Sequence, residues 1–188
     1  VIYYKNKKVE YDKYSLYVFE ESDGRILGRN DETCQTVVLN NSGMSKNYVV
    51  SQDYSKNVDF SAFVPGTLLR VALNSYNEIS SVEKVFVPNS DEGTVNEQNP
   101  ENETYMNSSL RVLLAEVAER DDNFIRLKKK KGEMAVSEYV NTDDILVFTC
   151  KTANRRAVIE ASDASALTVG KKALFILDYG RVKQAIIY

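Results

Sequence analysis

A strand–turn–strand pattern occurs twice in this chain of 188 residues, once near the end of each half. The first copy spans residues 63–85 and the second spans residues 167–187, so that Gly66 aligns with Gly170. A glycine at this point lets the chain enter a strand through a positive φ angle or close to a neighbouring backbone. The repeat therefore predicts two modules of one architecture, each about 80–90 residues long.

Strand-like periodicity dominates both halves of the sequence. Runs of aromatic and β-branched residues predict strands at 14–19, 35–39, 68–73, 79–87, 124–127, 145–148, 173–177 and 182–188. Residues 108–120 also fit a strand, whereas 163–167 fit one short helical turn capped by Ser162 or Asp163. Turns are expected at 20–25 and around Gly180. The predicted fold class is all-β, with two tandem small β-barrel or β-sandwich domains, OB-like or SH3-like.

A polar segment at residues 89–107 divides the two modules. It is acidic and rich in asparagine, and it offers too little apolar surface to offset the entropy of ordering it. We therefore predict a first domain at 1–88, a linker at 89–107 and a second domain at 108–188. The opening residues 1–5 resemble the closing strand 185–188, so the chain either begins on the last strand of a preceding module or the two strands look alike by chance.

The chain has no histidine and only two cysteines, which excludes much catalytic and metal chemistry. Histidine-activated nucleophiles and imidazole-bound zinc are ruled out. The carboxylate pairs Glu20-Glu21, Asp121-Asp122 and Asp143-Asp144 are read as turns, because adjacent strand residues point to opposite faces. No catalytic, cofactor-binding or metal-binding residue is predicted, and the protein is not expected to be an enzyme. Cys34 and Cys150 either form one disulfide or remain two buried thiols.

Two surface features could bind a partner. Lys128, Lys129, Lys130 and Lys131 precede Gly132 and form either a contact for a polyanion or partner, or a solvated hairpin tip. In a strand, half of these lysines would point to each face. Tyrosines cluster in the first 17 residues and could stack on sugars or bases, although tyrosine is also an ordinary strand residue. These are Tyr3, Tyr4, Tyr11, Tyr14 and Tyr17.

The pattern of an acidic residue, a small residue, Leu-x-Val-Gly, a strand, a turn and a closing strand ending in Ile-Ile-Tyr covers residues 161–188. Its counterpart in the first half spans 60–86, with Tyr76-Asn77-Glu78 where the pattern prefers glycine. This resembles β-modules of long secreted proteins of Clostridia-type bacteria, many of which carry S-layer homology domains. The resemblance implies a structural role at a cell surface and brings no catalytic motif.

The expected function is therefore structural: a module of a bacterial surface layer, an extracellular filament or a similar repetitive assembly. A glycan or cell-wall-polymer binding module and a phage virion component are the alternatives. The expected partners are copies of the same module, with cell-wall glycan as a further one, and the expected location is extracellular. The net charge of −3 and a pI of about 5.2 argue against a nucleic-acid partner. No apolar run is long enough for a membrane span.

Overall fold

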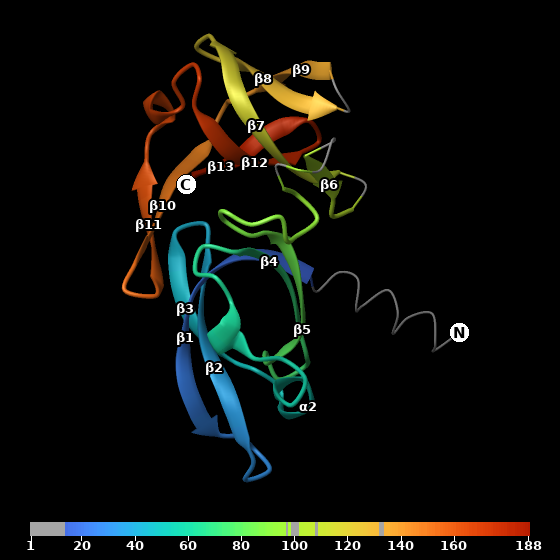
Figure 1. Ribbon diagram of the computed structural model, residues 1–188, viewed down its shortest axis with the longest axis vertical. Helices are drawn as coiled ribbons and strands as arrows, with labels where there is room; N and C mark the ends of the chain where they lie inside the picture. The colour runs from blue at the N-terminus through green and yellow to red at the C-terminus, as the bar shows by residue number, and fades with distance from the viewer. Residues whose placement is uncertain (1–13, 97, 99–101, 108, 132–133) are drawn as a thin grey trace, which may run out of the picture. The chain divides into compact units, whose positions relative to one another are not determined.

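A computed structural model of the protein describes residues 14–96, 98, 102–107, 109–131 and 134–188. The chain separates into two compact units (Figure 1). The first contains the residues up to Lys84 together with Thr152–Ala157, and the second contains Val85–Lys151 and Val158–Tyr188. Each unit has its own hydrophobic core, so each is described by itself.

The first unit is a five-stranded sheet in the order β3-β2-β1-β4-β5. The long strand β1 pairs antiparallel with both β2 and β4. A parallel bridge between Val50, just after β3, and Ile79 of β5 joins the two ends of the sheet. The elements are β1 (Tyr14–Leu27), β2 (Thr33–Asn41), β3 (Met44–Val49), α2 (Gln52–Ser55), the 3-10 turn η1 (Phe60–Ala62), β4 (Leu68–Leu73) and β5 (Ile79–Phe86).

The second unit repeats this arrangement with additions. Strand β7 pairs antiparallel with β8 and β12, β8 pairs with β9, and β12 pairs with β13. A parallel bridge between Arg181 of β13 and Asn141 of β9 joins the ends. The elements are β6 (Glu103–Tyr105), β7 (Leu110–Arg120), β8 (Phe124–Lys131), β9 (Met134–Asn141), β10 (Leu146–Ala153), β11 (Arg156–Ser162), the 3-10 turn η2 (Ala164–Ala166), β12 (Lys172–Asp178) and β13 (Arg181–Ile187).

Both units follow one strand connectivity. The first strand pairs with the second and the fourth, and the third strand meets the fifth in parallel. This is the order of the oligonucleotide/oligosaccharide-binding (OB) barrel. Where the first unit has helix α2 between the third and fourth strands, the second has the β10–β11 hairpin, except for residues Thr152–Ala157, which belong to the first unit. The predicted all-β fold with two small barrels is confirmed, in its OB-like form.

The repeat seen in the sequence is also a repeat of hydrogen bonds. The N–H of Gly66 donates to the carbonyl of Phe19 at 2.8 Å, and the N–H of Gly170 donates to Val117 at 2.7 Å. Both glycines have positive φ angles, 91° and 84°. The carboxylates of Asp59 and Asp163 cap η1 and η2 in the same way. Phe19 and Val117 therefore occupy equivalent positions in the two barrels.

We predict that Gly170→Ala lowers the unfolding free energy of the second unit by about 1 kcal/mol. A β-carbon at Gly170 would meet nothing within 4 Å, so the cost comes only from the left-handed backbone. Gly170→Asn is the matched control, because asparagine tolerates this conformation better. Hydrogen exchange in urea, read separately for peptides of each unit, measures both variants. Equal stability of wild type and Gly170→Ala would contradict the prediction.

Alternation along the strands builds each core. In the first unit the fully buried side chains of Phe19, Leu39, Phe60, Leu69 and Ile79 pack together. In the second unit the corresponding cluster contains Leu113, Val117, Leu127, Phe175 and Val182, among others. Cys34 lies in the first unit and Cys150 in the second, and both are buried thiols that form no disulfide.

Two local predictions need correction. Residues 20–25 do not form a turn, because β1 continues to Leu27 and absorbs the polar residues in two β-bulges, one between Phe19 and Glu21 and one between Ser22 and Gly24. Part of the predicted linker belongs to the second unit. Val95 is fully buried, and its N–H donates a hydrogen bond to the carbonyl of Val85. Strand β6 pairs with β7. No helix in the described part of the chain is long and apolar enough to cross a membrane.

Candidate functional site

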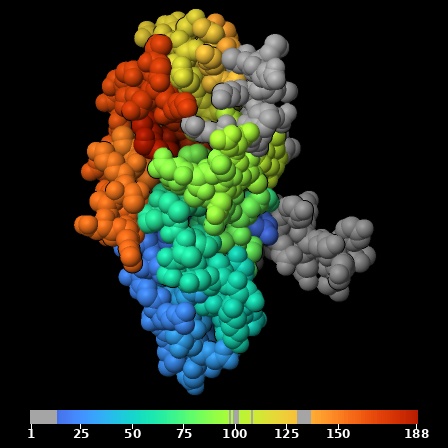
Figure 2. Space-filling view, in the orientation of Figure 1, coloured from blue at the N-terminus to red at the C-terminus, as the bar shows by residue number. Residues whose placement is uncertain are grey.

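The outer face of β7, β8 and β9 carries a group of aromatic and charged side chains. This part of the chain is yellow to orange in Figure 2. Ile125 and Leu127 of β8 point into the core, so that Phe124, Arg126 and Lys128 between and beside them face outward. The side chain of Phe124 is 49% exposed.

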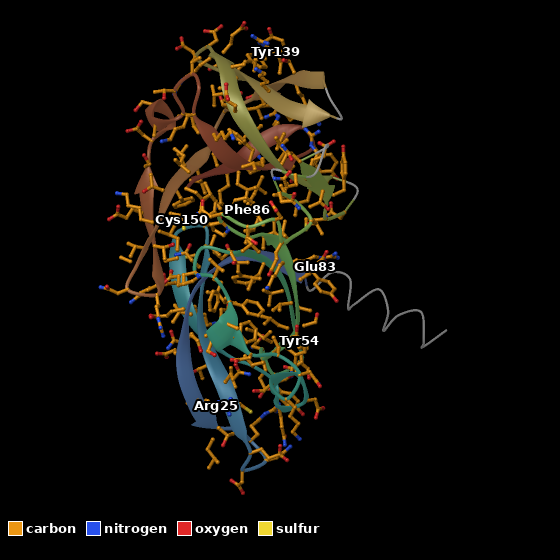
Figure 3. All side chains as sticks on the ribbon, in the orientation of Figure 1. Arg25, Tyr54, Glu83, Phe86, Tyr139 and Cys150 are labelled. Carbon is orange, nitrogen blue, oxygen red and sulfur yellow. The ribbon has the colours of Figure 1, made fainter. Side chains whose placement is uncertain are left out.

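Strand β9 adds a second aromatic side chain to this face. Tyr139 lies directly opposite Arg126 in the β8–β9 ladder and is 67% exposed (labelled in Figure 3). Phe124 pairs with Asn141, two residues further along β9, so that Phe124 and Tyr139 are diagonal neighbours. Such neighbours lie roughly 7–8 Å apart, within reach of aromatic side chains.

A β-bulge at Ala118 brings Glu119 onto the same face. Val117 pairs with Leu127 and both are buried, whereas Glu119 pairs with Arg126 and both face outward. Without the extra residue, Glu119 would have the inward orientation of Val117. Bulges commonly re-aim a side chain in this way.

These side chains are joined by hydrogen bonds through Glu119. Arg126 donates from Nη2 to Glu119 Oε1 at 2.6 Å, and the Tyr139 hydroxyl donates to Glu119 Oε2 at 3.2 Å. Arg126 also donates from Nη1 to Ser137 Oγ at 3.1 Å. The hydrogen bond that Arg126 donates to Glu119 lowers the pKa of Glu119 and raises the pKa of Arg126. Both groups are therefore charged at neutral pH.

A cleft of about 310 Å³ opens over this group. It is lined by Glu119, Arg120, Asp121, Phe124, Arg126 and Tyr139, and we call it the β7–β9 cleft. Arg120 donates to the carbonyls of Ala164 and Leu167, which attaches the rim of the cleft to turn η2. The cleft thus combines two exposed rings with a guanidinium held by a carboxylate.

The equivalent positions of the first barrel have different chemistry. The bulge after Phe19 places Glu21 opposite Val38, and Val38 lies opposite Asn47. Glu119, Arg126 and Tyr139 of the second barrel thus correspond to Glu21, Val38 and Asn47. The scaffold is repeated, but the aromatic–arginine group is specific to the second unit.

The predicted lysine cluster is divided between two faces by the strand geometry. Lys128 is exposed, whereas Lys129 is buried and bonds to Glu103 Oε2 at 2.6 Å. The side chains of Lys130 and Lys131, and Gly132, lie outside the described residues, as do Tyr3, Tyr4 and Tyr11. Gly180 has a φ of 73° in the β12–β13 turn.

Lys129 belongs to an ion network of four side chains at one end of the second barrel. Arg111 on β7 bonds to Glu103 on β6 at 3.1 Å and to Glu138 on β9 at 2.5 Å, and Lys129 lies 3.7 Å from Glu138. These side chains are on the core-facing side of their strands, next to Leu113 and Leu127. The network therefore balances two cations against two carboxylates.

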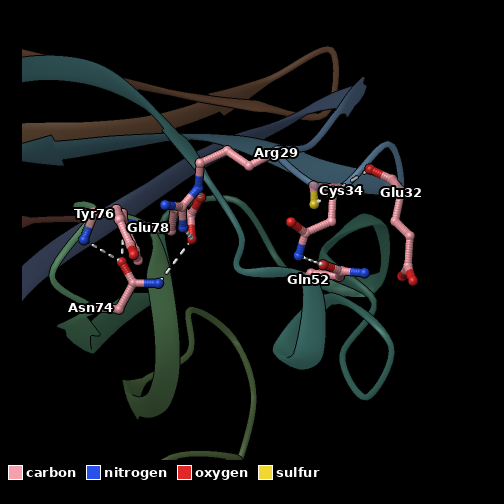
Figure 4. Close-up of polar contacts among 8 residues, drawn as sticks. Arg29, Glu32, Cys34, Gln52, Asn74, Tyr76 and Glu78 are labelled. Carbon is pink, nitrogen blue, oxygen red and sulfur yellow. Dashed lines mark hydrogen bonds and ion pairs between the residues drawn. The ribbon is translucent and has the colours of Figure 1, made fainter.

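A further polar cluster joins two turns of the first unit (Figure 4). Arg29 in the β1–β2 turn donates to both carboxylate oxygens of Glu78, at 3.0 and 2.9 Å, and its guanidinium lies 3.2 Å from the ring centroid of Tyr76. Asn74 donates to Glu78 at 2.8 Å. Burial raises the pKa of Glu78, but the hydrogen bonds from Asn74 and Arg29 lower it by more, so the pKa of Glu78 is below its usual value. These groups bind one another, which favours a structural tie between the turns.

Sequence reasoning did not single out the β7–β9 cleft. Phe124 and Arg126 are two residues apart on β8 and therefore lie on the same face of the strand. This spacing was the one sequence pattern that indicated an exposed aromatic residue beside a cation. The pairing with Glu119 and Tyr139 depends on strand register and on the bulge. Ala118 suits a regular strand, so the sequence gives no sign of the bulge.

No model of a known protein family matches this sequence, and no curated protein is detectably similar to it. Similar solved structures include the tetrameric p202 HIN2, with 12% identity, a TM-score of 0.28, and coverage of 80% of this chain and 92% of that one. A murine DNA-binding protein bound with double-stranded DNA has 8% identity and a TM-score of 0.29. The Ifi202 HINa domain in complex with double-stranded DNA has 10% identity and a TM-score of 0.28. The last two cover 88% of this chain and 96% of theirs.

These matches contradict the predicted role in a surface layer, filament or other assembly and the prediction of no nucleic-acid partner. The similar structures are HIN and DNA-binding proteins, and the alternatives of a glycan-binding or virion module are dropped with the main prediction. The negative net charge disfavours attraction to phosphates but does not oppose the stacking of bases on aromatic side chains. At these TM-scores the matches transfer no function to this chain.

Proposed function

We propose that the second unit binds single-stranded nucleic acid in the β7–β9 cleft, with bases stacked on Phe124 and Tyr139. The observation that carries the proposal is the pair of exposed aromatic side chains in one cleft, beside an arginine fixed by Glu119. Strands β8 and β9 are the second and third strands of an OB barrel, the face on which such barrels bind oligonucleotides.

Stacking explains how an acidic protein can bind a polyanion. The net charge of −3 disfavours binding driven by phosphate contacts. Each base stacked on an aromatic ring contributes about 1–3 kcal/mol, independently of protein charge and largely of base identity. Two rings and a neighbouring guanidinium therefore provide a binding surface for two or three unpaired bases.

Fluorescence anisotropy with a labelled oligothymidine of about ten nucleotides, within the site size of one OB barrel, tests the proposal. We expect Phe124→Ala and Tyr139→Ala each to weaken binding about tenfold or more. Tyr139→Phe keeps the ring, so we expect it to retain most of the affinity. Tyr105→Ala is the matched control, because Tyr105 is 62% exposed but lies on β6, opposite the other end of β7.

Two results would contradict the proposal. One is the absence of oligonucleotide binding by the wild-type protein at concentrations of hundreds of micromolar. The other is binding that Phe124→Ala, Tyr139→Ala and Tyr105→Ala leave unchanged or weaken equally. Circular dichroism of each variant checks that the barrel remains folded.

A further inference from the structure

The least expected feature of the cleft is a carboxylate at its centre. Glu119 uses one oxygen for Arg126 and the other for Tyr139, and the bulge at Ala118 is what turns it toward them. In a phosphate-binding site the guanidinium is expected to have no carboxylate partner, because the same N–H groups bind a phosphate as well as a carboxylate.

From this geometry we infer that Glu119 is a specificity-determining residue that makes the cleft select unpaired bases over backbone phosphates. The inference rests on the proposed function and names the kind of ligand that the cleft prefers. Glu119 occupies Arg126 with an ion pair, so a phosphate must compete with a carboxylate already bound at 2.6 Å.

The same contacts prepare the cleft for stacking. The bond from the Tyr139 hydroxyl to Glu119 restrains the ring, and the bonds of Arg126 to Glu119 and Ser137 restrain the guanidinium plane. Restraining these groups before binding reduces the entropy lost when a base stacks on them. A duplex presents phosphates outward and keeps its bases stacked on each other, so it can use neither ring.

The charge state required by this role holds across the neutral range. Because the bond from Arg126 lowers the pKa of Glu119, the carboxylate stays ionised well below pH 7. The carboxylate is therefore negatively charged at the neutral pH of the binding experiments.

Glu119→Gln tests the inference, because glutamine keeps the shape and loses the charge. We measure the dissociation constant for the oligothymidine, and for a duplex of the same length, at several salt concentrations. For the wild type we expect weak salt dependence and preference for the single strand. For Glu119→Gln we expect the slope of log affinity against log salt to steepen by about 0.7, the value for one added phosphate contact on a single strand. Duplex binding should become tighter.

Asp121→Asn is the matched control, because it removes another carboxylate from the same cleft. The Asp121 carboxylate accepts a hydrogen bond from the Asp122 N–H and none from Arg126 or Tyr139. An unchanged salt slope in Glu119→Gln, or an equal change in Asp121→Asn, would overturn the inference. These outcomes are distinct from failure of the proposed function, in which wild-type binding is absent or independent of Phe124 and Tyr139. If the wild type does not bind, the inference falls with the proposed function.

Discussion

Phe60→Ala is expected to lower the unfolding free energy of the first unit by about 4 kcal/mol, the typical cost of truncating a buried phenylalanine. Phe60 is fully buried, and its ring centroid lies 4.7 Å from that of Phe63 and 6.1 Å from that of Phe19. Its N–H donates to Gln35 Oε1 at 2.9 Å, which holds the backbone in place. The neighbouring side chains therefore cannot move far enough to fill the cavity that the truncation leaves.

Phe60→Leu is the control for Phe60→Ala, because it keeps most of the apolar volume and should cost about 1.5 kcal/mol. Hydrogen exchange in urea, followed on peptides of each unit, gives the loss for the first unit directly. A loss under 1 kcal/mol for Phe60→Ala would show that the aromatic cluster is not the centre of this core.

The second large effect is expected at the ion network of the second unit. Glu138→Gln leaves Arg111 and Lys129 with Glu103 as the one carboxylate of the network, and such an imbalance typically costs 3–5 kcal/mol. We expect about 3 kcal/mol, at the lower end of that range, because the Glu138 side chain is 32% exposed. Glu160→Gln, which breaks an exposed pair with Lys151, should cost under about 0.5 kcal/mol.

The network also predicts the sign of a pH effect. Burial raises the pKa of Glu138, but the bond and charge of Arg111 and the charge of Lys129 outweigh it, so the folded-state pKa lies below 4.5. Its stabilising contribution is present above pH 4.5 and is lost as the pH falls through the folded-state pKa. Urea unfolding between pH 3 and 7 should show that loss in the wild type and less of it in Glu138→Gln. Parallel pH curves would contradict this assignment.

Local sequence patterns predicted strands at the positions of β1, β2, β4, β5, β7, β8, β10, β12 and β13, and they missed β3, β6, β9 and β11. The segment 68–73 is β4, and 108–120 contains β7, because alternation reflects the burial of one face. The short helical turn predicted at 163–167 was also correct, and of the two predicted caps, Ser162 and Asp163, the structure has Asp163. The two barrels followed from the repeated glycine position, which both copies use for the same backbone bond.

The candidate site was not predictable in the same way. Glu119, Arg126 and Tyr139 come together through the register of three strands, and a one-residue bulge decides which face Glu119 occupies. The lysine run shows the same limit. Its alternation was predicted, but the partners of Lys129 come from β6 and β9 and required the tertiary structure.

The pairing of β7 with β12 has a consequence for how the second barrel forms. Leu114 pairs with Leu174 in this ladder, so β7 pairs with a strand that lies far along the chain. Contacts of such long sequence separation slow folding, because a large loop must close before they are made. During synthesis β7 emerges early with one side of its ladder unpaired and β12 not yet made. The first barrel, whose strands end at Phe86, can complete its own ladders in that interval.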